Sequence, residues 1–265
     1  MLSKEYFTMN EAKVTIPTII DINCMIGYWP NQKLRFHDTA GLLAAMESYR
    51  ISQCVAYHSY AHINLCQGND LIRQIAAKSS EKIKACYVLR SNLDSAELPD
   101  APGLMKQLRE QKPVAIKLFP NMHRYLADEF YCSELFDVLN ELKLPVMFDC
   151  DQKPSYDRLP ALAKNYPEIP FILLRQNLNE SRYTLPLLKK TKNIFFDTSI
   201  MIDTGLIDEI VNKYGSERLL FGSAMPFYVP SGGLTMIFYA RIKDSDKQNI
   251  LSSNWLGLER GIAWK

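Results

Sequence analysis

The chain has 265 residues, of which 47% are hydrophobic and 23% charged, and its formal net charge is +2. This composition is typical of a globular protein, and so small a net charge gives no reason to expect nucleic acid as a partner. The apolar runs are shorter than the ~20 residues that cross a bilayer, and the stretch after Met1 is polar, without the apolar core of a signal peptide.

Short apolar runs alternate along the chain with longer amphipathic stretches, a pattern that indicates βα units and a parallel sheet. The runs are nearly all apolar, as in strands that are buried on both faces. Residues 1–15 are interpreted as a polar N-terminal extension. The sequence then predicts eight strands, at Thr18–Asn23, Gln53–Tyr57, Ile83–Leu89, Ala115–Leu118, Pro145–Phe148, Phe171–Leu174, Ile194–Thr198 and Leu219–Gly222.

Helices are predicted between these strands from apolar residues at helical spacing. Asp38 is a good N-cap for the first of them, and Lys189, Lys190 and Lys192 mark a solvated helix end. The segment Pro230–Gly233 is predicted to be a loop above the last strand. The predicted helices are Asp38–Tyr49, Gln67–Lys78, Gly103–Glu110, Ser133–Leu142, Tyr156–Asn165, Asp203–Tyr214, Asp244–Ser252 and Trp255–Arg260.

Eight strands with intervening helices in a chain of this length favour a single-domain (β/α)₈ TIM barrel over residues 1–265, since such barrels typically take about 250 residues. A doubly wound open α/β sheet is the alternative. The sequence has neither G-x-G-x-x-G nor G-x-x-x-x-G-K, so no glycine-rich phosphate loop is predicted.

Several of the predicted strands carry a shared signature. Ile20–Gly27 reads I-D-I-N-C-M-I-G and resembles the I-D-x-H-x-H-x-G of the amidohydrolase superfamily. The chain is similar to the amidohydrolase-related branch, which contains decarboxylases and lactonases. The other segments that resemble this branch are Val114–Leu118 (V-G-I-K-L), Leu144–Asp149 (L-P-V-x-x-H), Phe171–Arg175, Asn193–Ser199, Arg218–Phe227 (R-L-L-F-G-S-D-x-P-F) and Ile250–Asn254 (I-L-x-x-N).

The resemblance implies a metal-dependent hydrolase fold, but the positions of the metal ligands are substituted. They hold Asn23, Met25, Asp149, Arg175 and Ala224. Asp149 is a good ligand, whereas the guanidinium of Arg175 would repel a cation. We therefore expect no bound metal and no other cofactor. A weaker alternative is a regrouped metal site built from Asp21, Asp149, Asp151 and His58.

Asp149 and Arg175 end neighbouring strands, so they are expected to face each other at the C-terminal mouth of the barrel. They are predicted to form a charge-assisted pair where the metal would otherwise bind. In one interpretation this pair only neutralises the vacated site. In the other, Arg175 and Lys117 bind a carboxylate or phosphate of a small ligand.

Two classes of function stay open at this stage. The first is an enzyme for hydrolysis, lactone opening or decarboxylation of a small carboxylate. Its candidates are Asp149 as acid or base, His58 as proton carrier, Arg175 and Lys117 as anion anchors, and Asn23 as a further substrate contact. His58 also fits a purely structural role. The second class is a catalytically inactive barrel that binds a small anionic metabolite or a partner protein.

The setting and partners follow from the remaining features. The six cysteines include no C-x-x-C pair, which argues against a structural zinc site or a disulfide scaffold and favours a reducing, cytoplasmic location. We expect a small, anionic ligand as the partner, and neither nucleic acid nor a membrane. The resemblance alone implies that the protein could form a homodimer.

Overall fold

A computed structural model of the chain describes residues 17–91, 93–176, 181–203 and 205–265. The eight strands found in these residues form one sheet in which each strand pairs in parallel with the next along the chain. This order confirms the (β/α)₈ barrel and not the doubly wound sheet. The strands are β1 (Ile20–Ile26), β2 (Gln53–His58), β3 (Ile83–Leu89), β4 (Ala115–Leu118), β5 (Val146–Asp149), β6 (Phe171–Leu174), β7 (Ile194–Asp197) and β8 (Leu219–Leu220).

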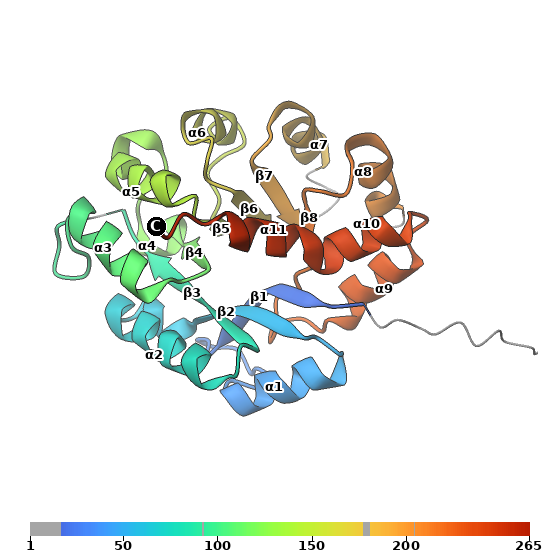
Figure 1. Cartoon of the computed structure of the whole chain (residues 1–265), viewed down its shortest axis with the longest axis horizontal. Coiled ribbons are helices and arrows are strands. Elements are labelled where there is room, and N and C mark those ends of the chain that lie inside the picture. Colours follow the sequence, from blue (N-terminus) through green and yellow to red (C-terminus); the bar gives the residue numbers. More distant parts are fainter. Residues whose placement is uncertain (1–16, 92, 177–180, 204) are drawn as a thin grey trace, which may run out of the picture.

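Helices surround the strands in chain order (Figure 1). All eight predicted helices are present, and Asp38 caps the first by accepting a hydrogen bond from the Gly41 N–H at 2.8 Å. The helices are α1 (Thr39–Ser48), α2 (Leu65–Lys78), α3 (Ala101–Gln111), α4 (Pro120–His123), α5 (Glu129–Leu142), α6 (Leu159–Asn165), α7 (Ser181–Lys190), α8 (Leu206–Tyr214), α9 (Ser231–Tyr239), α10 (Asp244–Gln248) and α11 (Asn254–Gly261), with a 3-10 helix at Ser59–His62 and a π-helical turn at Asn249–Ser253.

The prediction of a loop at Pro230–Gly233 is wrong, because α9 begins at Ser231. Two adjacent glycines cost a helix about 1 kcal/mol each relative to alanine. Leu234 and Ile237 compensate for this by burying their side chains in the core. A Cβ on Gly233 would lie 3.4 Å from the Phe221 ring, an ordinary van der Waals distance, so close packing does not require glycine there. Tertiary burial here outweighs local propensity.

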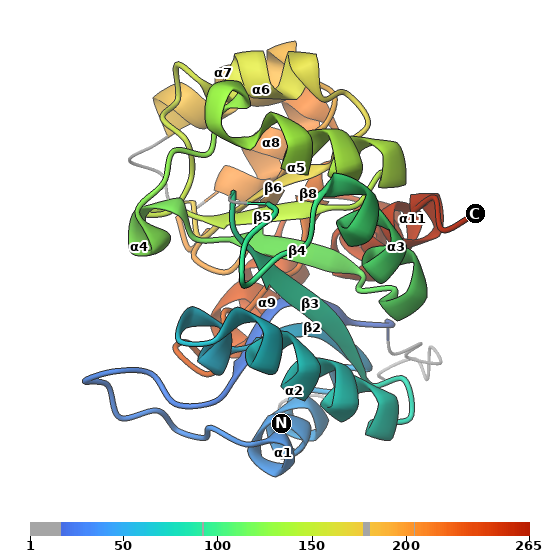
Figure 2. The ribbon, with the colours of Figure 1, turned by 90° about the vertical axis from the view of Figure 1, so that its left-hand side faces the viewer.

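The two ends of the barrel differ. The β1–α1 loop and α4, which both follow strand ends, lie on the left in Figure 2, and α11 lies on the right. Asn254 of α11 donates hydrogen bonds to the carbonyls of Ser216 and Leu219, where β8 begins, at 2.7 and 2.9 Å. Helix α11 therefore covers the amino ends of the strands, and the carboxyl ends form the opposite face. No helix in the described residues is both long and apolar enough to span a membrane.

A buried carboxylate helps to close the barrel between β1 and β8. Backbone bonds from Ile22 N to Phe221 O and from Met25 N to Met225 O join the two edges, at 3.0 and 2.9 Å. Between them, Oδ1 of the fully buried Asp21 accepts the N–H of Ser223 at 2.9 Å. The register of β1 on β2 shifts at this point. A side-chain oxygen thus takes the place of a ladder carbonyl in the seam.

We expect the Asp21→Asn variant to lose part of the pH dependence of stability. Burial, offset in part by hydrogen bonds from Ser223, raises the pKa of Asp21 from 3.8 to about 6. The folded chain therefore holds a proton that the unfolded chain has released, and stability falls as the pH rises through this window, by about 2–3 kcal/mol. Asparagine keeps the Oδ1 acceptor but does not titrate.

Urea unfolding at a series of pH values from about 4 to about 7 measures this difference. The matched control is Asp244→Asn, because the side chain of Asp244 is fully exposed. An Asp21→Asn variant whose stability keeps the pH slope of the parent chain would show that Asp21 is not the titrating group.

Candidate functional site

A cavity of about 320 Å³ opens among residues that lie at or follow the carboxyl ends of the strands. Most of its polar lining comes from four strands or the residues just after them, with Gln32 added from the β1–α1 loop. Its apolar lining includes aromatic rings, Met25, Ala224 and Met225. We call it the polar cavity. Its lining includes the side chains of Asn23, Tyr57, Lys117, Asp149, Asp151 and Arg175, with the rings of Trp29 and Phe227.

Lys117, on β4, places its ammonium among these groups. Its Nζ lies 3.1 Å from Asp149 Oδ2 and donates to Asn23 Oδ1, also at 3.1 Å. The same nitrogen lies 4.8 Å from the centroid of the Tyr57 ring, within the range of a cation–π contact. An ammonium has three N–H donors, and in the described part of the chain these two oxygens are its only acceptors. The third donor faces the rings or a molecule in the cavity.

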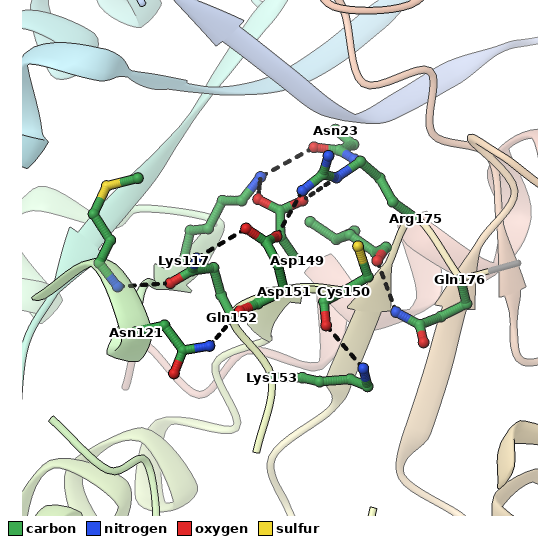
Figure 3. A network of polar contacts seen from close by, with 12 residues as sticks. Asn23, Lys117, Asn121, Asp149, Cys150, Asp151, Gln152, Lys153, Arg175 and Gln176 are labelled. Atoms are coloured by element: carbon green, nitrogen blue, oxygen red, sulfur yellow. Dashed lines mark hydrogen bonds and ion pairs between the residues drawn. The ribbon is translucent and has the colours of Figure 1, made fainter. Parts of the chain in front are cut away.

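Asp149, at the end of β5, is shared between two cations (Figure 3). Its Oδ2 contacts Lys117, and its Oδ1 accepts from Arg175 Nε at 2.9 Å. The pair that the sequence places at the mouth is therefore present. Burial alone would raise the pKa of Asp149, but the charges of Lys117 and Arg175 outweigh it and hold this pKa below its usual value. Asp149 is an anion across the neutral pH range.

Arg175 is held in an uncommon backbone conformation directly after β6. Its φ is +56°, in the left-handed region that residues with a Cβ seldom adopt. Its backbone N–H donates to Asp197 Oδ1 at 2.7 Å, and its Nη2 donates to Asp151 Oδ1 at 2.8 Å. The neighbouring carboxylates outweigh the effect of burial and raise the pKa of the guanidinium further. Three carboxylates therefore fix the position of one arginine.

Asp197, at the end of β7, was missed as a site residue by the sequence reasoning. It is fully buried, and its Oδ2 accepts from Asn23 Nδ2 at 3.0 Å. Its Oδ1 accepts from the Arg175 backbone and from Ser199 Oγ. Burial raises the pKa of Asp197. The available signal was an acidic residue that ends an otherwise apolar barrel strand, the position at which barrels carry functional groups.

Asp197 sets the orientation of Asn23 and through it the position of Lys117. Because its Oδ2 accepts from Asn23 Nδ2, the other end of the amide, Oδ1, is turned toward the ammonium. The contact depends on Gly222, where an added Cβ would lie 2.6 Å from Asp197 Oδ2 and 3.1 Å from Asn23 Cβ. Asp197 is therefore a positioning residue for both cations of the polar cavity.

His58 lies apart from this network. It ends β2, and its Nδ1 accepts the N–H of Tyr60 at 3.1 Å, which caps the 3-10 helix that follows. Burial lowers the pKa of its imidazole. Its side chain lines a second cavity of about 590 Å³, which we call the apolar cavity. The structure thus brings together four of the predicted site residues in the polar cavity: Asn23, Lys117, Asp149 and Arg175. It places His58 in the neighbouring apolar cavity.

An eight-stranded parallel barrel with polar groups at the carboxyl ends of its strands is the architecture on which barrel enzymes build their active sites. The amidohydrolase family model matches residues 92–254, more than half of the sequence, so the chain belongs to the amidohydrolase family. The resemblance seen in the strand sequences is thereby confirmed. No curated protein sequence matches the chain closely enough to serve as a relative.

Solved structures share the fold at low identity. An uncharacterised TIM-barrel protein from Bordetella bronchiseptica has a TM-score of 0.73 and 14% identity over 92% of this chain and 99% of its own. A dihydroxybenzoic acid decarboxylase from Polaromonas sp. JS666, with bound manganese and the inhibitor 2-nitroresorcinol, has a TM-score of 0.70 and 12% identity over 92% and 97%. The 4-oxalomesaconate hydratase of Rhodopseudomonas palustris has a TM-score of 0.69 and 17% identity over 92% and 96%.

The residues of this mouth do not fit a metal ion of the kind bound in the manganese-containing decarboxylase. Both oxygens of Asp149 are engaged by cations, and Asn23 already accepts from one of them. Met25 and Ala224 offer no oxygen or nitrogen side-chain ligand. Within residues 17–91, 93–176, 181–203 and 205–265, no three His, Cys, Asp or Glu side chains are placed to hold an ion. The regrouped site around Asp21 and His58 is not formed there either.

Exchanging two side chains of the network tests its geometry. We expect Asp197→Asn to cost about 1–3 kcal/mol of stability, because its amide N–H₂ would meet that of Asn23 donor to donor. Turning Asn23 over instead would present N–H₂ to Lys117. The double variant N23D/D197N restores an acceptor for both Lys117 and residue 197, so its stability should recover toward that of the parent. The free energies of unfolding in urea of the parent, Asn23→Asp, Asp197→Asn and the double variant form a double-mutant cycle. Purely additive losses would contradict the network.

Metal content is expected to be substoichiometric. The protein would be purified without chelators or a histidine tag, and elemental mass spectrometry would be applied before and after incubation with zinc and with manganese. The ammonium of Lys117 and the guanidinium of Arg175 lie where an ion would bind, and they already pair with both oxygens of Asp149, the one good metal ligand among the substituted positions. About one retained metal per chain in either sample would contradict this expectation and direct attention to Asp149 and Asp151.

Proposed function

We propose that the protein is a metal-independent enzyme that acts on a small carboxylate or lactone by hydrolase- or decarboxylase-like chemistry in the polar cavity. The observation that carries this proposal is the ammonium of Lys117, which lies where the strands end and has a third N–H donor beyond those given to Asp149 and Asn23. Family membership supports the reaction class. The similar structures include decarboxylases and a hydratase, which at such low identity support the fold alone.

In this proposal Lys117 donates a hydrogen bond to the substrate oxygen on which negative charge develops. A fixed cation in a site that excludes water stabilises such charge more than water does, and it needs no reorganisation during the reaction. Asn23 and Asp149 hold the ammonium in place. Arg175 has five N–H donors, and the remaining ones bind the carboxylate of the substrate.

Decarboxylation at this site would break the bond between carbon and the carboxylate and release CO₂. The electron pair left on carbon is delocalised onto the oxygen that contacts Lys117, and a proton from the ammonium completes the new C–H bond. Asp149, at 3.1 Å, holds Lys117 in place, but as an anion it has no proton to return to the amine. Its lowered pKa makes it a weak base, so water restores the proton. His58 lines the neighbouring apolar cavity, away from the reacting carboxylate, so it has no part in this step.

A second candidate is a catalytically inactive barrel that binds a small anionic metabolite. The observation in its favour is Ala224, which places a methyl group where the family motif has an aspartate. In addition, carboxylates already neutralise both cations of the cavity. This candidate predicts binding through Arg175 and Lys117 without turnover.

Comparing the parent chain with Lys117→Met tests the proposal. Methionine keeps an alkyl chain between the rings and removes the ammonium. Loss of a charge-assisted hydrogen bond should weaken binding of small carboxylates about 10- to 100-fold. Calorimetric titration with benzoate, salicylate and short aliphatic acids measures the affinity, and NMR of the same mixtures detects lactone opening or CO₂ release. The control is Lys153→Met, because Lys153 lies close by but outside the lining of the polar cavity.

Binding with turnover, both lost in Lys117→Met and retained in Lys153→Met, is the result expected of the enzyme. Binding that depends on Lys117 without turnover of any compound would establish the inactive barrel instead. Carboxylate affinity that is equal in the parent chain and in Lys117→Met would overturn both candidates.

A further inference from the structure

The apolar cavity lies beside the polar cavity at the same face of the barrel. Its volume is about 590 Å³, within the range that holds a small-molecule ligand. It is formed by the β1–α1 loop, the end of β2, the 3-10 helix and α4, and among the residues that the structure describes no Asp, Glu, Lys or Arg lines it. Its lining includes Tyr28, Trp29, His58, His62, Ile63 and Met122.

One layer of aromatic rings separates the two cavities. Trp29 lines both of them. Its ring packs edge-on against Phe227 of the polar cavity, with 5.4 Å between the ring centroids. It also packs edge-on against His62 of the apolar cavity, with 5.2 Å between the centroids. Tyr57 of the polar cavity also meets His62, at 5.8 Å. A ligand anchored at Lys117 therefore lies one layer of side chains away from the apolar cavity, with Trp29 as the residue that both cavities share.

The outer wall of the apolar cavity is exposed to an unusual degree for apolar side chains. Tyr28 and Ile63 are each 75% exposed, and Met122 is 42% exposed. Large apolar side chains gathered around a concavity mark a binding site, because covering them removes apolar surface from water. Neighbouring His62 is neutral near pH 7, since burial above all lowers its pKa to about 3. The cavity thus attracts an uncharged, apolar group.

We infer that the apolar cavity binds the apolar body of the substrate while its carboxylate or lactone end lies at Lys117 and Arg175. The substrate class is therefore an acid or lactone that carries an aryl or alkyl body, and not a short polar acid. This inference rests on the proposed function. The two cavities share Trp29 as a wall, and this adjacency favours the substrate as the occupant, with a second copy of the chain as the competing occupant.

A homologous series of ω-phenylalkanoic acids, from phenylacetate to 6-phenylhexanoate, tests the inference by calorimetric titration of the full chain. We expect affinity to rise about fourfold for each added methylene that enters the cavity, the ratio that corresponds to ~0.8 kcal/mol per buried CH₂. The double variant I63S/M122S removes part of the apolar wall and should flatten this dependence on chain length. The control is Leu126→Ser, because Leu126 is 60% exposed and lines neither cavity.

The outcomes separate this inference from the proposed function. Affinity that rises with chain length in the parent and in Leu126→Ser, but not in I63S/M122S, supports the inference. A flat series in the parent, with phenylacetate binding that still depends on Lys117, overturns the inference and leaves the proposed function standing. A concentration-dependent dimer in ultracentrifugation that dissociates in I63S/M122S assigns the exposed wall to an interface between copies and also overturns it. Failure of every acid to bind rejects both.

Discussion

The mouth of this barrel is organised by one constraint, which is that a buried carboxylate must be compensated. Asp149 is 8% exposed and meets Lys117 through one oxygen and Arg175 through the other. Removing either cation would leave a buried charge only half neutralised, at a cost of several kcal/mol. The cations in turn need further oxygens, which Asn23 and Asp151 supply. The other polar contacts of the site follow from this first pairing.

The pairing of buried charges also fixes the orientation of side chains in the site. The amide of Asn23 has a donor end and an acceptor end, and Asp197 and Lys117 require opposite ones. The backbone of Arg175 has a left-handed conformation, and in it the N–H donates to Asp197. Networks in which every polar group has one acceptable arrangement specify a unique structure more strongly than apolar packing does. The site is preorganised before any ligand binds.

Much of the fold and of the candidate site could be predicted from the sequence. The features that could not be predicted depend on contacts between residues far apart in the chain. The strands follow from short apolar runs, and Asp149 meets Arg175 because parallel neighbouring strands end at the same face. The role of Asp197 depends on Asn23, which is 174 residues away, and on the missing Cβ of Gly222, neither of which has a local signature. Helix α9 escaped prediction because the burial of Leu234 and Ile237 is a tertiary effect. His58 was placed by strand position alone, which does not say which of two adjoining cavities it faces.

A cation that belongs to a side chain is supplied by folding itself. Lys117 is encoded at its position, so its charge cannot be exchanged for that of another ion, withdrawn by a chelator or limited by the supply of trace elements in the cell. The same feature has a chemical limit, because an ammonium carries a single charge and has no open coordination position with which to acidify a water molecule, as a divalent ion does. Under the proposed metal-independent chemistry, a barrel with this site would give up hydroxide generation at neutral pH and gain a centre that is complete as soon as the chain is folded.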